Sequence, residues 1–490
     1  MQTQTEKNRW IALYVLCVGM LMIVLDVTVV NVALPSIQDD LGFSQSNLAW
    51  VVNAYLIAFG GLLLLAGRFG DLIGRKKVFL AGLGLFTLAS LVCGASQSQE
   101  MLVAARFVQG AAGAMTSAVI LGMIVTMFPE PREQAKAIGV YAFVASAGGA
   151  VGLLAGGILT QSINWHWIFF VNIPIGIVTA VLARRTLAGD EGIGIRQGAD
   201  TPGATLITAS LMLGVYTIVK PAAELGWGDA QTLGLAAASL VLLAAFILRE
   251  ARAETPLIPL GIFRSRNISG ANVVQALSVA GMFGPFFLGS LYLERVLGYD
   301  ALQIGLAFLP VTIFMGTLSY RYSERLIMRF GAKNLVVPGL GMIVVALVLF
   351  ALAPVGGSYV VNILPVTILL GTGAGLAFPA LMGVAMSGVT PENAGLASGL
   401  VNTSAQVGGA LGLAVLATLS TTRTASAVAD GASTASALTS GYHLAFLVAA
   451  GLLLASIAVA VVVIEPPAKQ QAEVTELPAE ADDELACEAA

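Results

Sequence analysis

The sequence predicts an all-α integral membrane protein with fourteen transmembrane helices. Of its 490 residues, 57% are hydrophobic and only 11% are charged, whereas soluble domains carry about 25% charged residues. A helix needs ~20 consecutive apolar residues to cross the hydrocarbon core of a bilayer. Fourteen segments meet this requirement, near residues 11–34, 48–67, 78–97, 101–127, 137–160, 167–183, 202–219, 231–248, 271–293, 302–320, 335–354, 358–381, 395–420 and 441–464.

The basic residues predict that both chain ends lie in the cytoplasm. An even number of spans places both termini on the same side. If that side is cytoplasmic, the inside segments hold 20 Lys and Arg residues and the outside segments hold three, which are Lys220, Arg295 and Arg423. Cytoplasmic loops of membrane proteins carry such an excess of basic residues. We therefore expect a multi-pass protein of the cell membrane.

The segment between the second and third spans, Gly67 to Phe79, reads GRFGDLIGRKKVF. The positive-inside bias explains its bases but not its spaced glycines or its single acid. The segment resembles the loop between helices 2 and 3 of the major facilitator superfamily of transporters. In that family the aspartate and an arginine of this loop hold the two halves of the transporter together on the cytoplasmic side. The resemblance implies a cytoplasmic gating loop formed by Gly67, Gly70, Asp71, Gly74, Arg75 and Lys76.

A second, weaker copy of this segment follows the tenth span. Ser323 to Val336 reads SERLIMRFGAKNLV and again combines an acid, arginine, glycine and lysine. Transporter folds are commonly built from such repeats. Because the repeat pairs the second span with the tenth rather than the eighth, two extra helices separate two bundles of six. This arrangement resembles the fourteen-helix drug:proton antiporter branch of the superfamily.

The repeat and the charge pattern divide the chain into five parts. Two of them are six-helix bundles, and the part between them carries the two extra helices, 202–219 and 231–248. The last part is rich in Ala, Glu and Pro, a composition typical of disorder. The expected boundaries are a cytoplasmic tail at 1–10, the first bundle at 11–184, the linker at 185–266, the second bundle at 267–464 and a disordered acidic tail at 465–490.

Asp26 is the only acid within any predicted span. It lies in LDVTVVNVALP, Leu25 to Pro35, which is similar to the first-helix signature of the fourteen-helix branch. An ionised side chain at this depth costs at least ~2.5 kcal/mol, so Asp26 is expected to face a cavity or a partner. Two interpretations remain open: a carboxylate that binds and releases a proton, or a structural ion pair between two helices.

Arg106 is the only base within a predicted span and is the expected partner of Asp26. Arg106, Gln109, Gly110 and Gly113 share one helical face because they are spaced by three and four residues. Their segment, RFVQGAAGAM, resembles the fourth-helix motif of the superfamily, where this arginine is linked to proton coupling. Counting ~1.5 Å per residue places the two side chains at similar depths, and a static salt bridge is again the alternative.

The fifth span carries glycines at every fourth position, Gly148, Gly152 and Gly156, with Gly149 and Gly157 beside them. This spacing lets helix backbones approach closely. The stretch also resembles the fifth-helix motif of antiporters, whose pattern is Gly-Pro-x-x-Gly-Gly. Leu153 stands where that pattern has proline, so only the packing role of Gly148, Gly152, Gly156 and Gly157 is predicted.

Several uncharged polar residues lie within the apolar spans. Such groups either contact substrate or bond two helices to each other, where each bond contributes ~0.6 kcal/mol. His166 and His443 lie at span ends, where an interfacial position is expected. The candidate substrate-cavity residues are Asn31, Gln109, Asn272, Gln275, Asn402 and Gln406.

The sequence favours a secondary active transporter over other classes. It contains no phosphate-binding GxxxxGK[ST] motif, no metal-ligand cluster and no basic nucleic-acid footprint. We expect no cofactor and no metal, no ATP or nucleic-acid partner, and a monomer in the lipid bilayer that exchanges protons for a small molecule. The resemblance implies proton-coupled efflux of bulky, apolar drugs or antibiotics. Export of an endogenous metabolite, lipid or siderophore is the alternative, and a channel, an enzyme or a non-transporting receptor or scaffold fits less well.

Overall fold

In the part of the chain that the computed structural model describes, every regular element is a helix. Most helices are long and begin or end at glycine, proline or a capping serine, as Ser98 and Ser265 do at the starts of α5 and α12. The described residues are 2–43, 48, 50–194, 200–253, 256, 260–299, 301–387, 389, 390 and 393–464.

The helices before residue 190 are α1 (Gln2–Leu41), α3 (Trp50–Ile73), α4 (Arg75–Gly94), α5 (Gln99–Met127), α6 (Pro131–Ser162), α7 (Trp167–Phe170) and α8 (Asn172–Thr186). Next come α9 (Thr201–Val219), α10 (Pro221–Glu224) and α11 (Ala230–Glu250). The remaining elements are η2 (Leu260–Arg264), α12 (Arg266–Arg295), α13 (Ala301–Thr317), η3 (Leu318–Tyr322), α14 (Ser323–Phe330), α15 (Lys333–Phe350), η4 (Tyr359–Ile363), α16 (Leu364–Ala385), α17 (Ala394–Ala429) and α18 (Thr434–Val463).

Within the described residues, twelve helical segments are long and apolar enough to cross a membrane. Each of them overlaps a predicted span, so the all-α membrane class is confirmed. The other two predicted spans, 137–160 and 202–219, fall on α6 and α9. The apolar part of α9, Pro202–Ile218, is shorter than a typical span, and the total of fourteen stays a prediction.

The predicted loop between the second and third spans is almost entirely helical, which corrects the sequence analysis. Helix α3 continues to Ile73 and α4 begins at Arg75, so Gly74 alone breaks the helix with a φ of 106°. Gly331 does the same between α14 and α15 with a φ of 80°. Only glycine adopts such backbone angles without steric cost. The two repeat segments therefore share one backbone feature, a break between two helices at a glycine with a positive φ.

Because α3 extends to Ile73, it contains two charged residues that the sequence places in a loop. Arg68 and Asp71, expected in a loop, are buried in α3 at 3% exposure each. Asp26 and Arg106 are therefore not the only buried charged residues in spanning helices. Charged side chains are tolerated at such depth only where they meet partners, so each of the four must be explained by its contacts.

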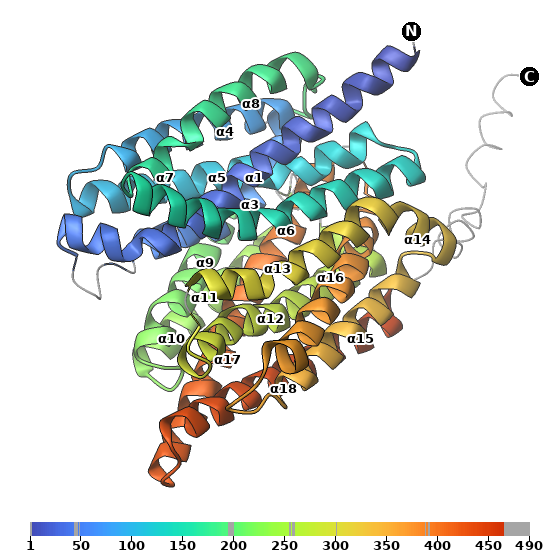
Figure 1. Cartoon of the computed structure of the whole chain (residues 1–490). Coiled ribbons are helices and arrows are strands. Elements are labelled where there is room, and N and C mark those ends of the chain that lie inside the picture. Colours follow the sequence, from blue (N-terminus) through green and yellow to red (C-terminus); the bar gives the residue numbers. More distant parts are fainter. Residues whose placement is uncertain are drawn as a thin grey trace, which may run out of the picture.

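The chain forms two groups of helices (Figure 1). Helices α1 to α8 lie in the upper part of the view, and α12 to α18 lie in the lower part. The groups meet where α3 and α5 contact α17, and where α6 contacts α13 and α16. Helices α9 and α11 pack on each other, and α9 lies along α3 and also touches α17.

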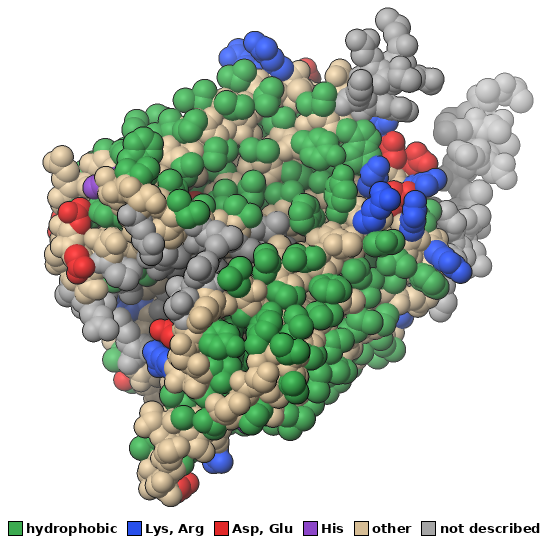
Figure 2. All heavy atoms as spheres, viewed as in Figure 1, with side chains coloured by type: hydrophobic (Ala, Val, Ile, Leu, Met, Phe, Trp, Pro, Cys, Tyr) green, Lys and Arg blue, Asp and Glu red, His purple; other side chains and the backbone are tan. Residues whose placement is uncertain are grey.

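The surface agrees with a membrane location. Figure 2 shows a face dominated by hydrophobic side chains, while a cluster of acidic and basic side chains lies at the end that carries α14. Leu240, Val241 and Ile158 are examples of large apolar side chains more than 60% exposed. Exposed apolar area on this scale is typical of a surface covered by lipid.

Candidate functional site

The predicted contact between Asp26 and Arg106 is present. Nη1 of Arg106 on α5 donates to Oδ2 of Asp26 on α1 at 2.5 Å. Gln109 and Asn172 donate to the other carboxylate oxygen, Oδ1, at 2.7 and 3.1 Å. The Asp26 and Arg106 side chains are 0% and 1% exposed. A carboxylate with three donors is well solvated by the protein itself, which offsets much of the cost of burial.

Arg106 is held by further groups that do not depend on Asp26. Its Nε donates to the carbonyl oxygen of Val51 at 2.9 Å, and Nη1 also donates to Oε1 of Gln109 at 2.7 Å. The Tyr55 ring lies 4.4 Å from the guanidinium carbon, a distance typical of a cation–π contact. The arginine can therefore stay in place while the carboxylate changes its charge.

Gln109 lies at the centre of this buried network. Its Nε2 donates to Ser90 Oγ at 2.8 Å as well as to Asp26, and the Cys93 thiol donates to its Oε1 at 3.4 Å. Gln109 itself has no exposed surface. The network thus joins α1, α3, α4, α5 and α8, all from the first group of helices.

A second set of polar contacts joins the two groups of helices, and we call it the gate. It consists of Asp71 at the end of α3 and the first residues of α17. Asp71 Oδ1 accepts from the Gly395 amide and Oδ2 from the Leu396 amide, both at 2.7 Å. A carboxylate at a helix N-terminus also meets the positive end of the helix dipole. Arg75 donates to Asp71 Oδ1 through Nε at 3.1 Å and Nη2 at 3.0 Å.

Glycines let the backbones meet at the gate. A Cβ on Gly67 would lie 2.5 Å from the Gly395 carbonyl oxygen and 3.1 Å from the Gly399 Cα. A Cβ on Gly122 would lie 2.6 Å from the Ala394 carbonyl oxygen. Gly70 instead packs within its own group, against Val119. At this end of the molecule the two groups of helices are therefore in direct backbone contact.

Comparison with known proteins gives these features a context. The family model described as "Major Facilitator Superfamily" matches residues 16–413. The chain belongs to the major facilitator superfamily. It is 40% identical over 466 residues to the puromycin resistance protein pur8 of Streptomyces alboniger, covering 94% of this chain and 92% of the relative. It is 38% identical over 437 residues to the cephamycin export protein CmcT of Amycolatopsis lactamdurans, covering 88% and 89% of the two chains.

Solved structures show the same fold at much lower identity. The human organic anion transporter MFSD10 superimposes with a TM-score of 0.65 at 15% identity, covering 92% of this chain and 99% of that one. The proton:xylose symporter XylE gives 0.64 at 14% identity, with 94% and 97% covered. The chain is therefore a multi-pass cell-membrane protein with the major facilitator fold, and membership of this superfamily implies a small-molecule substrate.

The superfamily segment around Gly74 is fixed by contacts with the end of the first group of helices. The Asp190 carboxylate accepts from the amides of Arg75 at 2.8 Å and Lys76 at 3.2 Å, and so caps α4. Lys76 Nζ donates to the carbonyl oxygens of Leu187 at 2.5 Å and Arg184 at 3.1 Å, at the end of α8. Both interactions lie within the first group, whereas Asp71 and Gly67 reach the second.

The glycines of α6 divide into two sets. Positions Gly148, Gly152 and Gly156 face α1, where an added Cβ would meet Val24, Thr28 and Val29. Gly157, predicted to belong to the packing motif, has no atom of the described residues within 4 Å of its Cβ position. The motif is therefore a stripe at every fourth residue, and the expectation for Gly157 is wrong because it lies on another face of the helix. The side chain of Leu153, the position of the missing proline, lies outside the described residues.

The candidate cavity residues have different environments. Gln109 belongs to the buried network, which corrects its expected place in a cavity. Asn272 on α12 donates to the Ile268 carbonyl at 2.8 Å and accepts from Ser404 of α17 at 2.9 Å, so it bonds two helices. Gln275 is 4% exposed, and its Oε1 has no hydrogen-bond partner among the described residues. The side chain of Asn31 lies outside the described residues.

Two of the candidates on α17 keep part of their surface free. Asn402 is half-buried and donates to the Ser398 carbonyl at 3.0 Å, and Gln406, one turn further along the same stripe, is also half-buried. These amides and Gln275 retain capacity for further hydrogen bonds, which is what a substrate contact needs. Their role as cavity residues stays a prediction.

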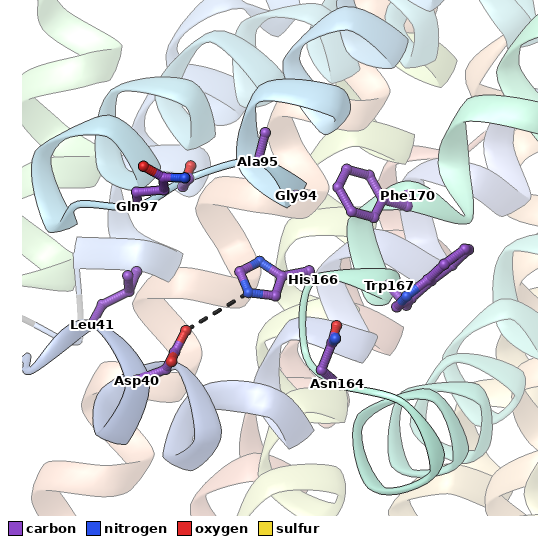
Figure 3. A pocket seen from close by; sticks show the side chains of 10 residues that line it. Asp40, Leu41, Gly94, Ala95, Gln97, Asn164, His166, Trp167 and Phe170 are labelled. Atoms are coloured by element: carbon purple, nitrogen blue, oxygen red, sulfur yellow. Dashed lines mark ion pairs between the residues drawn. The ribbon is translucent and has the colours of Figure 1, made fainter.

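His166 lies in a pocket at the opposite end of the molecule from the gate. Its Nε2 is 3.7 Å from Asp40 at the end of α1, and the ring of Trp165 lies 3.8 Å from the imidazole ring. Figure 3 shows the histidine at the centre of this pocket, between Asp40 and Trp167. The partners are interfacial, as expected for a histidine at a span end, and no contact to the Asp26 network is present among the described residues.

The members of the network differ in how visible they are in the sequence. Asn172 is detectable as the one amide in the apolar run IFFVNIPI, but others carry no such signal. Ser90 and Tyr55 are ordinary residues in their spans, and Val51 contributes only its backbone carbonyl. The pair itself, expected to face a cavity or a partner, is enclosed by helices and meets its partners there. Burial is possible because these unforeseen groups supply the hydrogen bonds that water would otherwise provide.

Proposed function

We propose that this transporter exports bulky, largely apolar small molecules across the cell membrane in exchange for protons. The observation that carries the proposal is the buried Asp26 carboxylate with its donors Arg106, Gln109 and Asn172. An ionisable residue in this position is a functional candidate by default. Two relatives, a puromycin resistance protein and a cephamycin export protein, favour antibiotics as the substrate class.

Asp26 is the proposed proton-binding group and Arg106 its charge partner. When Asp26 gains a proton, the attraction to Arg106 falls from that of an ion pair to that of a neutral hydrogen bond. Arg106 keeps Val51, Gln109 and Tyr55 as partners, so the network loosens between α1 and α5 without leaving the arginine unsatisfied. Protonation of Asp26 would then change how α1 packs against α5 within the first bundle. In this proposal, that change is passed on to the rest of the transporter.

Substrate moves by alternating access in this proposal. Two six-helix bundles, 11–184 and 267–464, rock about the substrate cavity, while α9 and α11 form an added hairpin outside them. The contacts of Asp71 with Gly395 and Leu396 represent the state in which the gate is closed. The excess of basic residues supports a cytoplasmic location for this end and for both termini. Opening requires these two hydrogen bonds to break.

The substrate cavity is proposed to recognise its ligands mainly by apolar contact and amides. Asn272, Gln275, Asn402 and Gln406 are the proposed polar contacts. Within the described spans of the second bundle no acid is buried, so a dication would lack a second counter-charge there. Neutral and singly charged compounds are the favoured substrates, and apolar contacts permit breadth. The protein acts as a monomer and catalyses no covalent chemistry in this proposal.

The test is transport by the purified chain in proteoliposomes. An imposed pH gradient should drive uptake of a singly charged aromatic antibiotic into inverted vesicles, and collapse of the gradient with an uncoupler should stop it. Flux that ignores the gradient would contradict proton coupling. Flux that follows it but excludes every antibiotic tested would redirect the proposal to an endogenous metabolite, lipid or siderophore.

A further inference from the structure

The pocket around His166 lies at the end of the first group of helices opposite the gate, and we call it the His166 pocket. Its walls come from the last turn of α1, the turn between α4 and α5, and the turn between α6 and α8. Its volume is about 470 Å³, which is within the range of small-molecule sites. None of its lining residues belongs to the Asp26 network or to the gate, so neither of these explains the pocket.

Asp40 supplies a carboxylate to this pocket. Trp165 Nε1 donates to its Oδ2 at 3.0 Å, and His166 Nε2 lies 3.7 Å from the same oxygen, which is beyond hydrogen-bond distance. The other oxygen, Oδ1, accepts no hydrogen bond from the described residues, and the Asp40 side chain is 56% exposed. The indole thus fixes the carboxylate and leaves one of its oxygens available to a ligand.

Two aromatic rings line the pocket on the side of the histidine away from Asp40 (Figure 3). The rings of Trp167 and Phe170 lie edge to face with their centroids 5.8 Å apart, and Trp167 is 45% exposed. Gly94 makes room for Phe170, because an added Cβ would lie 2.5 Å from that ring. The faces of aromatic rings attract cations. A carboxylate and two rings around one pocket are the groups that recognise an ammonium ion.

The electrostatic environment of the pocket also favours a cation. Helices α1 and α4 both end there, at Leu41 and Gly94, and a helix C-terminus carries the negative end of the helix dipole. The connecting segments at this end of the first group are 35–50, 95–100 and 161–170. They contain three acids, Asp39, Asp40 and Glu100, and no Lys or Arg. The positive N-terminus of α5 lies nearby, but Glu100 in its first turn offsets it. A field of one sign raises the local concentration of the opposite ion.

We propose that the His166 pocket binds a small organic ammonium ion, with Asp40 as its counter-charge and Trp167 and Phe170 as its aromatic walls. An anion would meet only negative groups there, and a neutral apolar molecule would cover the carboxylate without pairing it, which is unfavourable. The site lies apart from Asp26 and from the proposed substrate cavity. In the proposed orientation it opens to the outside of the cell, where a free amine or the ammonium headgroup of a lipid can reach it.

The test measures binding of choline to the full chain in nanodiscs made only of phosphatidylglycerol, whose headgroup carries no ammonium. Saturation-transfer NMR at about 0.15 M salt keeps distant charges screened. A protonated imidazole would compete for Asp40, so the titration is run at about pH 8. The neutral analogue 3,3-dimethylbutan-1-ol has nearly the shape of choline without its charge. We expect saturable binding of choline and at least about threefold weaker binding of the analogue. Equal affinities, or no saturable binding of choline, would overturn the proposal.

Three substitutions locate the bound ion. Asp40→Asn removes the counter-charge and Trp167→Leu removes an aromatic face, so each should weaken choline binding by about threefold or more. Asp39→Asn is the matched control, because it removes an exposed acid of the same helix that does not line the pocket. It should change the affinity by less than about twofold. Equal weakening by Asp39→Asn and Asp40→Asn would overturn the proposal. So would unchanged binding in Trp167→Leu, an exposed substitution that tests the site even if Asp40→Asn fails to fold.

A second lipid composition identifies the source of the ammonium group. Phosphatidylethanolamine is added to the nanodiscs and the choline titration is repeated with the wild-type protein and with Trp167→Leu. Weaker choline binding to the wild-type protein alone would assign the pocket to a lipid headgroup, and unchanged binding would assign it to a free amine. Neither titration needs a proton gradient or transport, so a failure of the proposed export activity would be seen separately.

Discussion

Asp26 and Arg106, 80 residues apart in the chain, form a 2.5 Å ion pair with almost no exposed surface in the middle of the first bundle. Neither side chain is exposed to solvent in this arrangement. The charge of each must therefore be compensated by the other side chain or by the surrounding amide groups.

Removing Arg106 alone should destabilise the protein more than removing both members of the pair. Arg106→Gln leaves the buried Asp26 carboxylate without its cation, a loss that typically costs about 3–5 kcal/mol. Asp26→Asn in the same chain removes the unpaired charge and should recover most of this stability. Thermal unfolding in detergent, followed by size-exclusion chromatography, compares the wild-type protein, Arg106→Gln and the double variant. A double variant less stable than Arg106→Gln would show that the pair is not coupled in this way.

Gly67→Ala should prevent the gate from closing fully. The new methyl group would lie 2.5 Å from the Gly395 carbonyl oxygen, and two helix backbones cannot yield as a side chain can. We expect transport to fall by about tenfold or more, since overpacking of this kind costs about 1–3 kcal/mol in the closed state. Gly84→Ala in α4 is the matched control, because none of the residues that the structure describes lies within 4 Å of its Cβ position. Equal activity of the two variants in proteoliposomes would contradict the assignment of the gate.

The stripe on α6 predicts different outcomes for Gly152, which belongs to it, and for Gly157, which lies on another face of the helix. Gly152→Ala places a methyl group against Thr28, whose hydroxyl bonds to the Val24 and Leu25 carbonyls at 3.0 and 3.1 Å. A loss of about 1–3 kcal/mol is expected from this overpacking. Gly157→Ala meets no atom of the described part of the chain within 4 Å and should leave the melting temperature unchanged. The interpretation of the stripe fails if Gly157→Ala is the more damaging variant.

The sequence predicts the positions of the helices well, but it does not predict where α3 ends. Apolar length located the helices, because the bilayer sets one requirement for all of them. It misplaced the end of α3, where Arg68 and Asp71 suggested a loop. Charges usually mark the end of a span, but here Gly395 and Leu396 of a distant helix satisfy Asp71. No local pattern reports such a partner.

The same limit applies to the candidate site. Asp26 and Arg106 were predictable because a lone acid and a lone base in apolar spans need each other. Val51 was not, because it contributes only a backbone carbonyl, and backbone groups carry no residue signature. The helical spacing correctly puts Gln109 on the same face as Arg106. It does not show which helices pack against that face, so the sequence predicts a cavity where the structure has Asp26 and Ser90. Packing partners, more than periodicity, decide whether a polar residue meets substrate or protein.

Substrate charge provides a separate test of the proposed cavity. Matched compounds that carry one or two positive charges on the same aromatic scaffold are compared in the same proteoliposomes. We expect export of the singly charged compound to exceed that of the dication by about tenfold or more, because an unpaired charge in a site of low dielectric costs several kcal/mol. Equal or better export of the dication would mean that a second acid reaches the cavity.

We propose that Asp26 carries the coupled proton, and the substitution Asp26→Asn removes this proton-binding group. Asn keeps the shape of the side chain and can still accept from Arg106, but it cannot gain or lose a proton at neutral pH. The variant is measured in two assays on the same vesicles: uptake driven by a pH gradient, and exchange of labelled for unlabelled substrate without a gradient. We expect gradient-driven uptake to fall to background while exchange continues. Gradient-driven uptake at the wild-type rate would show that the coupled proton binds elsewhere.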